Sequence, residues 1–188
     1  MNYNSLILIR YKYIVLVLND IKYELNLNRN IFYEGKIIDV EKFTTQYLNF
    51  FSKHKIPKSF WKKEIKVIHN SLYNKNDVEK LYNVFKDLNY RNVVLVNEKS
   101  LLDLNSKCNY LLNDDNLRLF YIDKYNTKKQ LVIDKENYYT HEIKCLIKNR
   151  TNNKDLVIVG SVPLEYLDNE INYYFYEDFD EFFLKNYL

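Results

Sequence analysis

The sequence predicts an α/β protein built on mixed sheets with crossover helices, in which the second half repeats the first in shortened form. Short runs rich in Ile, Val, Leu and Tyr open the chain with turn residues between them, which predicts strands. Strand-like and helix-like runs then alternate. With 188 residues, of which 47% are hydrophobic and 28% charged, the chain is long and apolar enough to bury a core.

Three strands are expected at the start of the chain, joined as two antiparallel hairpins. Asn19-Asp20, between the second and third strands, is typical of a tight turn. Asp39 is a residue type that caps helices, and the apolar spacing after it predicts a helix that ends near Ser52. The three strands are expected at 6–9, 13–18 and 21–27.

Strands and helices alternate over the rest of the first half, which is typical of parallel strands joined by crossover helices. Asn76 or Asp77 is expected to cap the first of these helices. Three meandering strands followed by this alternation form the ribonuclease H-like order. The expected ranges are 64–69 and 93–96 for the strands, the second of them buried, and 78–88 and 99–104 for the helices.

The second half repeats this theme in fewer residues. The pattern predicts a hairpin around Asn126-Thr127, two further short strands and a final amphipathic helix, while 140–148 fits either a strand or a helix. These elements are expected at 117–122, 130–134, 156–159, 173–176 and 179–187, with a helical turn at 162–167. We therefore expect a first domain at 1–104, a join at 105–116 and a shortened second domain at 117–188.

The residue counts exclude several function classes. The chain has two glycines, Gly35 and Gly160, so neither a P-loop nor a GxGxxG turn can be written. Cys108 and Cys145 form no CxxC pattern, and no metal site or signal peptide is predicted. A cytoplasmic location is expected, either free or at the periphery of a membrane complex.

Two stretches resemble the actin-like ATPase superfamily. The run YEGKIIDVEKF at 33–43 is similar to the G-x-I-x-D-x-E entry to a helix in the bacterial actin homologue MreB and in its relatives FtsA and PilM. Further on, Glu98 matches the glutamate of the MreB pattern E-P-x-A-A, with Lys99 in place of the proline. The resemblance implies two ribonuclease H-like halves in series, with three loops for ATP and magnesium.

Each of these loops is degenerate here. The first loop, an Asp-x-Gly turn in the family, has neither the aspartate nor the glycine here. The second loop, Asp-x-Gly-Gly-Gly-Thr in the family, keeps its aspartate but none of its glycines. The third loop, which contacts adenosine, keeps one glycine of a pair. Because backbone N–H groups reach phosphate oxygens only where no side chain intervenes, we expect no cofactor and no catalysis. The loop positions are Arg10, Tyr11 and Lys12, then Asp123, Tyr125 and Asn126, then Gly160 and Ser161.

The favoured function is a non-catalytic actin-like scaffold or assembly protein, of the cell-shape, division or pilus-platform type, that binds a protein partner or itself. Acidic residues surround aromatic side chains at helical spacing in the final helix, which would suit a partner's groove or this protein's own core. These are Phe179, Phe182, Phe183 and Tyr187. The first alternative is a divergent active ATPase, in which Asp123 would position a metal-bound water and Gly160 would lie at the base of the nucleotide.

The second alternative is a protein that binds nucleic acid or an anionic surface. Lysines are interleaved with aromatic residues after the first helix, a pattern that also fits a solvated loop. They are Lys53, Lys55, Lys58, Lys62, Lys63 and Lys66.

Overall fold

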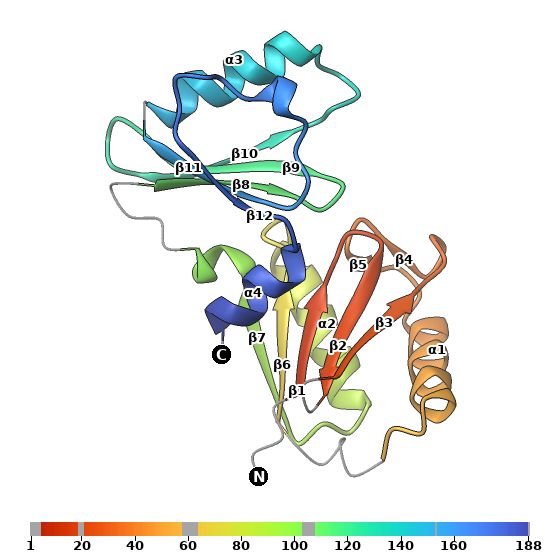
Figure 1. Ribbon diagram of the computed structural model, residues 1–188. Helices are drawn as coiled ribbons and strands as arrows, with labels where there is room; N and C mark the ends of the chain where they lie inside the picture. The colour runs from red at the N-terminus through yellow and green to blue at the C-terminus, as the bar shows by residue number, and fades with distance from the viewer. Residues whose placement is uncertain (1–4, 19–20, 58–63, 103–107, 153, 188) are drawn as a thin grey trace. The chain divides into compact units, whose positions relative to one another are not determined.

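A computed structural model describes residues 5–18, 21–57, 64–102, 108–152 and 154–187, with the side chains of the last two described residues left out. The chain divides into two compact units, residues 1–100 and 101–188. Each unit has its own five-stranded sheet (Figure 1). The expected mixed α/β fold is therefore confirmed.

The first sheet has the strand order β3-β2-β1-β6-β7. β2 pairs antiparallel with β1 and β3, whereas β1, β6 and β7 run parallel, as the sequence predicts. β7 was expected to be buried, but among its residues Val93 alone is buried, because β7 is the last strand of the sheet. The strands are β1 Ser5–Ile9, β2 Tyr13–Leu18, β3 Ile21–Asn26, β6 Glu64–His69 and β7 Asn92–Asn97, with a small hairpin of β4 Phe32–Tyr33 and β5 Lys36–Ile37.

The helices of the first unit begin at side-chain caps. In α1, Val40–Lys53, the carboxylate of Asp39 accepts a hydrogen bond from the backbone N–H of Lys42, as predicted. α2, Lys75–Asp87, begins earlier than expected, because Asn74 is its cap and forms a reciprocal capping box with Asp77. Asp77 is thus the third helical residue rather than the cap. The 3-10 helix η2, Glu98–Leu101, follows β7.

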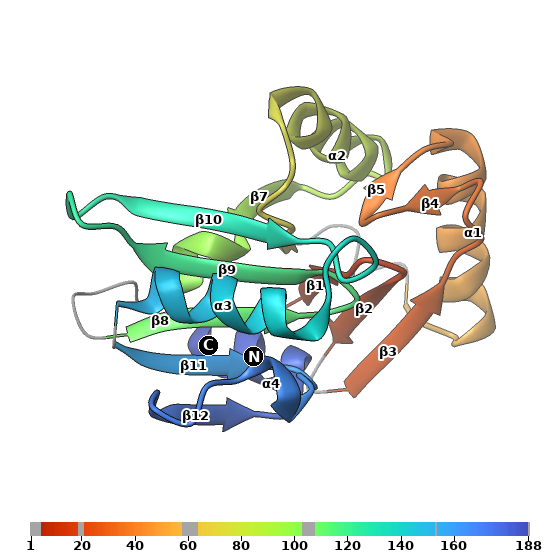
Figure 2. The same ribbon diagram turned by 90° about the horizontal axis from the view of Figure 1, so that it is seen from above.

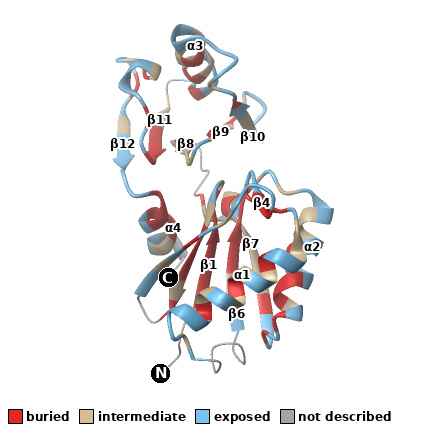
Figure 3. Ribbon diagram, turned by 90° about the vertical axis from the view of Figure 1, so that its right-hand side faces the viewer, coloured by how far each residue is buried: buried red, intermediate tan, exposed pale blue. Residues whose placement is uncertain are grey.

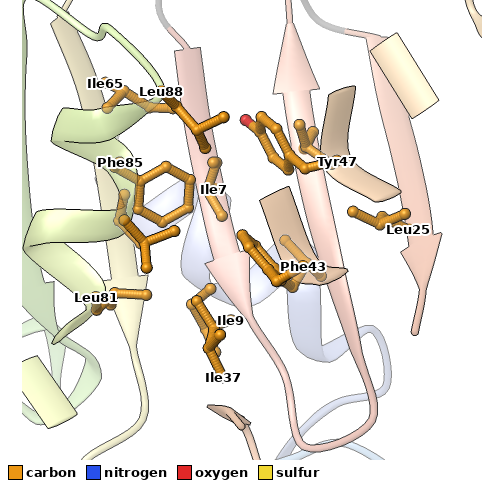
Figure 4. Close-up of a cluster of buried hydrophobic side chains, with 14 of the residues drawn as sticks. Ile7, Ile9, Leu25, Ile37, Phe43, Tyr47, Ile65, Leu81, Phe85 and Leu88 are labelled. Atoms are coloured by element: carbon orange, nitrogen blue, oxygen red, sulfur yellow. The ribbon is translucent and has the colours of Figure 1, made fainter. Parts of the chain in front are cut away.

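The core of the first unit lies between its sheet and the two helices. Side chains of α1 and α2 converge on those of the strands (Figure 4), and the outward faces of the helices are exposed (Figure 3). The hydroxyls of Tyr47 and Tyr90 lie 2.7 Å apart inside this core. Its fully buried members include Ile7, Ile9, Phe43, Tyr47, Ile65 and Phe85.

The second sheet repeats the first, with the order β10-β9-β8-β11-β12. Its β8 lies within 105–116, the stretch expected to be a join, so the second unit begins before residue 117. β8 takes the place that β1 has in the first sheet, antiparallel to one neighbour and parallel to the other. The strands are β8 Cys108–Asn113, β9 Leu117–Ile122, β10 Lys128–Ile133, β11 Asp155–Val159 and β12 Tyr173–Tyr176.

The second unit is shortened in its crossovers. The stretch that fitted either a strand or a helix is helix α3, Thr140–Thr151. Between β11 and β12, where the first unit has α2, there is only the 3-10 turn η3, Leu164–Tyr166. α4, Phe179–Tyr187, ends the chain as predicted. Among the described residues, no helix combines the length and apolar character needed to cross a membrane.

Candidate functional site

Buried polar side chains gather at one edge of the first sheet, the one formed by the carboxyl ends of its parallel strands. β1, β6 and β7 are parallel, so the residues that follow them lie at the same edge. Arg10, Asn70 and Glu98 follow these strands, and each is 1% exposed. In open α/β sheets, ligands bind outside the carboxyl ends of the strands. This edge is therefore the candidate functional site of the first unit.

The polar groups at this edge bind the protein's own backbone. The carboxylate of Glu98 accepts a hydrogen bond from the N–H of Ser71 at 2.8 Å, and the amide oxygen of Asn70 accepts one from the N–H of Leu72 at 2.8 Å. The hydroxyl of Tyr73 donates to the carbonyl of Gly35. These contacts hold the loop after β6 in place.

The first turn, between β1 and β2, is closed by its own backbone. The N–H of Arg10 donates to the carbonyl of Tyr13 at 3.0 Å, and the carbonyl of Tyr11 accepts from the N–H of Gly35 at 2.8 Å. Arg10 is buried, Tyr11 is half-buried and Lys12 is exposed. All three positions therefore carry side chains at the place where the family has an aspartate and a glycine.

The corresponding turn of the second unit lies between β8 and β9, because β8 is the counterpart of β1. It reads Asn113-Asp114-Asp115-Asn116 and has no glycine. The guanidinium of Arg118 binds the carboxylate of Asp114 at 2.7 Å, and both side chains are nearly inaccessible to solvent. The sequence signal for this pair was an arginine inside an otherwise apolar strand, four residues after an aspartate.

The expected second nucleotide loop was therefore misplaced. Asp123, Tyr125 and Asn126 lie in the β9–β10 hairpin, between the second and third strands of the unit. The carboxylate of Asp123 accepts hydrogen bonds from the N–H groups of Thr127 at 2.8 Å and Tyr125 at 2.9 Å, and these bonds lower the pKa of Asp123. Asp123 holds the hairpin turn together.

Gly160 follows β11 and is required by close packing. Its φ is +89°, and a Cβ at this position would lie 2.2 Å from the backbone carbonyl oxygen of Asn113. The side-chain amide of Asn113 donates to the carbonyl of Ser161. The structure thus gives Gly160 and Ser161 a role in joining β11 to the end of β8.

The aromatic residues of α4 are not a free apolar stripe. Phe179, Phe182 and Phe183 are buried, and the ring of Phe182 contacts those of Tyr110 and Tyr176 in the same unit. Of the two alternatives, the partner's groove is therefore corrected for these three residues, because they pack within the chain. The side chain of Tyr187 lies outside the described part.

The lysine stretch is described only in part. Lys58, Lys62 and Lys63 lie outside the described residues. Lys53 and Lys55 are exposed and Lys66 is half-buried on β6.

Comparisons with known proteins identify the fold. No protein-family model and no curated protein matches the sequence. Among solved structures, MreB 5 of Spiroplasma citri bound to AMPPNP aligns with a TM-score of 0.61 at 9% identity, over 99% of this chain and 95% of that one. The ethanolamine utilization protein EutJ of Carboxydothermus hydrogenoformans aligns with a TM-score of 0.63 at 12% identity, over 92% of this chain and 85% of that one. The chain therefore has an actin-like fold.

Proposed function

We propose that this chain is a non-catalytic actin-like scaffold or assembly protein that neither hydrolyses ATP nor binds it tightly. The observation that carries the proposal is that the first turn of each unit lacks glycine, that backbone hydrogen bonds close the turn of the first unit, and that Asp114 in the turn of the second unit is bound to Arg118. Such a protein would act in cell shape, division or a pilus platform, in the cytoplasm or at the periphery of a membrane complex.

The first turn is unsuited to magnesium and phosphate. Arg10 stands where the family has a metal-organising aspartate, and its guanidinium carries the same sign of charge as a metal ion. In an Asp-x-Gly turn whose aspartate is replaced by Arg10, the glycine is replaced by Lys12, and the added side chain keeps phosphate oxygens away from the backbone N–H groups.

The second turn is unsuited as well. Asp115 puts a second carboxylate at the turn between β8 and β9, and its negative charge repels phosphate. The carboxylate of Asp114 is bound to the buried Arg118. For the rival function, an active ATPase, Asp123 would have to position a metal-bound water, but its carboxylate is bound to its own hairpin.

A surface for assembly lies along the outermost strand of the second sheet. β12 is the last strand of that sheet and pairs with β11 alone among the described strands. Tyr174, Phe175 and Tyr176 are 52%, 50% and 46% exposed. Exposed edge strands pair readily with other chains, and aromatic residues are enriched at interfaces. We propose that β12 is the contact through which the chain assembles.

Calorimetry and light scattering test the two parts of this proposal. Titration with Mg-ATP should give no binding with a Kd below about 100 μM, and phosphate release should match the blank, with a nucleotide-binding MreB as the positive control. Light scattering should detect oligomers of the full chain, which Phe175→Ser abolishes and Tyr139→Ser, at the residue before α3, does not. Micromolar ATP binding, or a strict monomer at all concentrations, would contradict the corresponding part.

A further inference from the structure

A basic groove with two tyrosine rings lies within the second unit, beside the β9–β10 hairpin turn that Asp123 holds together. It has a volume of about 420 Å³ and lies between the β9–β10 hairpin and the end of α3. Figure 2 shows the hairpin tip and the last turn of α3 at the same end of the sheet. Its lining residues are Tyr121, Asp123, Lys124, Tyr125, Lys129, Asn149, Arg150 and Asn152.

The charge of this groove is positive. Lys124, Lys129 and Arg150 supply three cations against the one carboxylate of Asp123. That carboxylate is turned to the hairpin, because one of its oxygens accepts two backbone N–H groups and the other lies 3.9 Å from the ammonium of Lys129. The groove therefore presents an excess of cations at the surface.

The aromatic rings are already in contact with these cations. The ammonium of Lys124 lies 5.0 Å from the ring centroid of Tyr125, and the guanidinium of Arg150 lies 5.9 Å from that of Tyr121. Tyr125 is 75% exposed, at the tip of a hairpin held by Asp123 and by Asn126, whose φ is +60°. A tyrosine on a rigid turn has a free face on which a planar ring can stack.

We propose that this groove binds single-stranded nucleic acid. Proteins that bind single strands combine a positively charged groove for the phosphates with aromatic side chains on which the bases stack. Lys124, Lys129 and Arg150 contact phosphates, and Tyr125 stacks on a base. Asn149 and Asn152 add amide donors at the groove wall. The sugar-phosphate backbone of the strand lies along the open groove, and the bases make no base-specific contacts.

Fluorescence anisotropy of a labelled dodecathymidine with the full chain tests this proposal over a salt series. Each cation that neutralises a phosphate contributes about −0.7 to the slope of log affinity against log salt, so the three predict a slope near −2. Lys124→Gln and Arg150→Gln should each reduce this slope by about 0.7. Tyr125→Ala should weaken binding about tenfold without changing the slope, and Tyr125→Trp should restore it.

Matched variants separate this groove from other sites. Tyr139→Ala removes an equally exposed tyrosine at the opposite end of α3, and it should leave binding unchanged. Lys53→Gln with Lys55→Gln tests the lysine stretch of the first unit. Circular dichroism of each variant verifies folding.

Three results would overturn the proposal. The first is that the chain does not bind the oligonucleotide at low salt. The second is that the Lys53 and Lys55 variant loses binding while the groove variants keep it. The third is that polyglutamate competes as well as unlabelled oligonucleotide while Tyr125→Ala has no effect on binding. The last result would assign the groove to an acidic protein segment.

Discussion

Replacing Gly160 with alanine tests whether this glycine serves packing rather than a nucleotide loop. Two physical effects oppose the new methyl group. The backbone of Gly160 has a φ of +89°, a region that L-residues rarely adopt. The added Cβ would also lie 2.2 Å from the carbonyl oxygen of Asn113 and 3.3 Å from the ring of Phe179.

The magnitude follows from these two effects. A left-handed conformation costs an L-residue about 1–2 kcal/mol. Overpacking adds about 1–3 kcal/mol, and the neighbour here is backbone at the end of a central strand, which cannot rotate away. Gly160→Ala should therefore lower the free energy of unfolding of the second unit by about 2–5 kcal/mol.

Gly35 provides a matched control in the first unit. Its φ is +75°, but a Cβ there would lie 3.3 Å from the carbonyl oxygen of Arg10, which is a tight contact rather than a clash. Gly35→Ala should thus cost about 1–2 kcal/mol, from the backbone conformation alone.

Hydrogen exchange measures the two units separately in the intact chain. Gly160→Ala should speed exchange in β8 and β11 about thirtyfold or more, because 1.4 kcal/mol corresponds to a factor of ten. Gly35→Ala should affect the first unit only, and less strongly. If Gly160→Ala exchanges like the wild type, or if Gly35→Ala is the more damaging change, the packing argument for Gly160 fails.

Two further predictions concern the buried tyrosines of the first unit. Tyr47→Phe leaves the hydroxyl of Tyr90 without its partner at 2.7 Å and should lower the free energy of unfolding, measured by urea denaturation, by about 1–3 kcal/mol. Adding Tyr90→Phe should recover most of this loss, because neither hydroxyl is then buried without a partner. A double variant less stable than Tyr47→Phe would refute this prediction. Burial raises the pKa values of Tyr47, Tyr73 and Tyr90 above 10, so the native state holds these protons more tightly than the unfolded state. The free energy of unfolding is therefore fully retained below pH 10 and falls at higher pH, by about 1.4 kcal/mol per pH unit for each of these tyrosines. Tyrosinate absorbance and denaturation, measured in parallel across this pH range, should detect the loss. Ionisation of all three tyrosines in the folded state at pH 10 would contradict this prediction.

The first unit could be predicted closely from the sequence because its local signals agree with its fold. β6 has the predicted bounds, and α1 begins after Asp39. The cap of α2 was placed too late, since a capping box requires a residue three positions before Asp77, and that residue is Asn74. β7 was expected to be buried because its residues are apolar, whereas strand order places it at the edge.

The second unit was predicted less well because β8 has a weak signal. Its six residues, CNYLLN, contain three large apolar or aromatic side chains between polar ends, so the stretch reads as a join. Missing β8 shifted the strand count by one. The β9–β10 hairpin with Asp123 was then taken for the turn that in fact lies at Asp114. The partnership of Asp114 with Arg118 crosses the β8–β9 turn and needs that strand pair to be recognised.

The two glycines of this chain have the same role in the two repeats. The N–H of Gly35 donates to the carbonyl of Tyr11 in the turn after β1, and a Cβ on Gly35 would touch the carbonyl of Arg10. Gly160 presses on the carbonyl of Asn113 at the end of β8, the counterpart of β1. Each glycine thus allows a second segment to pack against the backbone at the end of the first strand. Backbone conformation and close packing together account for both glycines, and this is what a scaffold needs if it keeps the fold without the nucleotide.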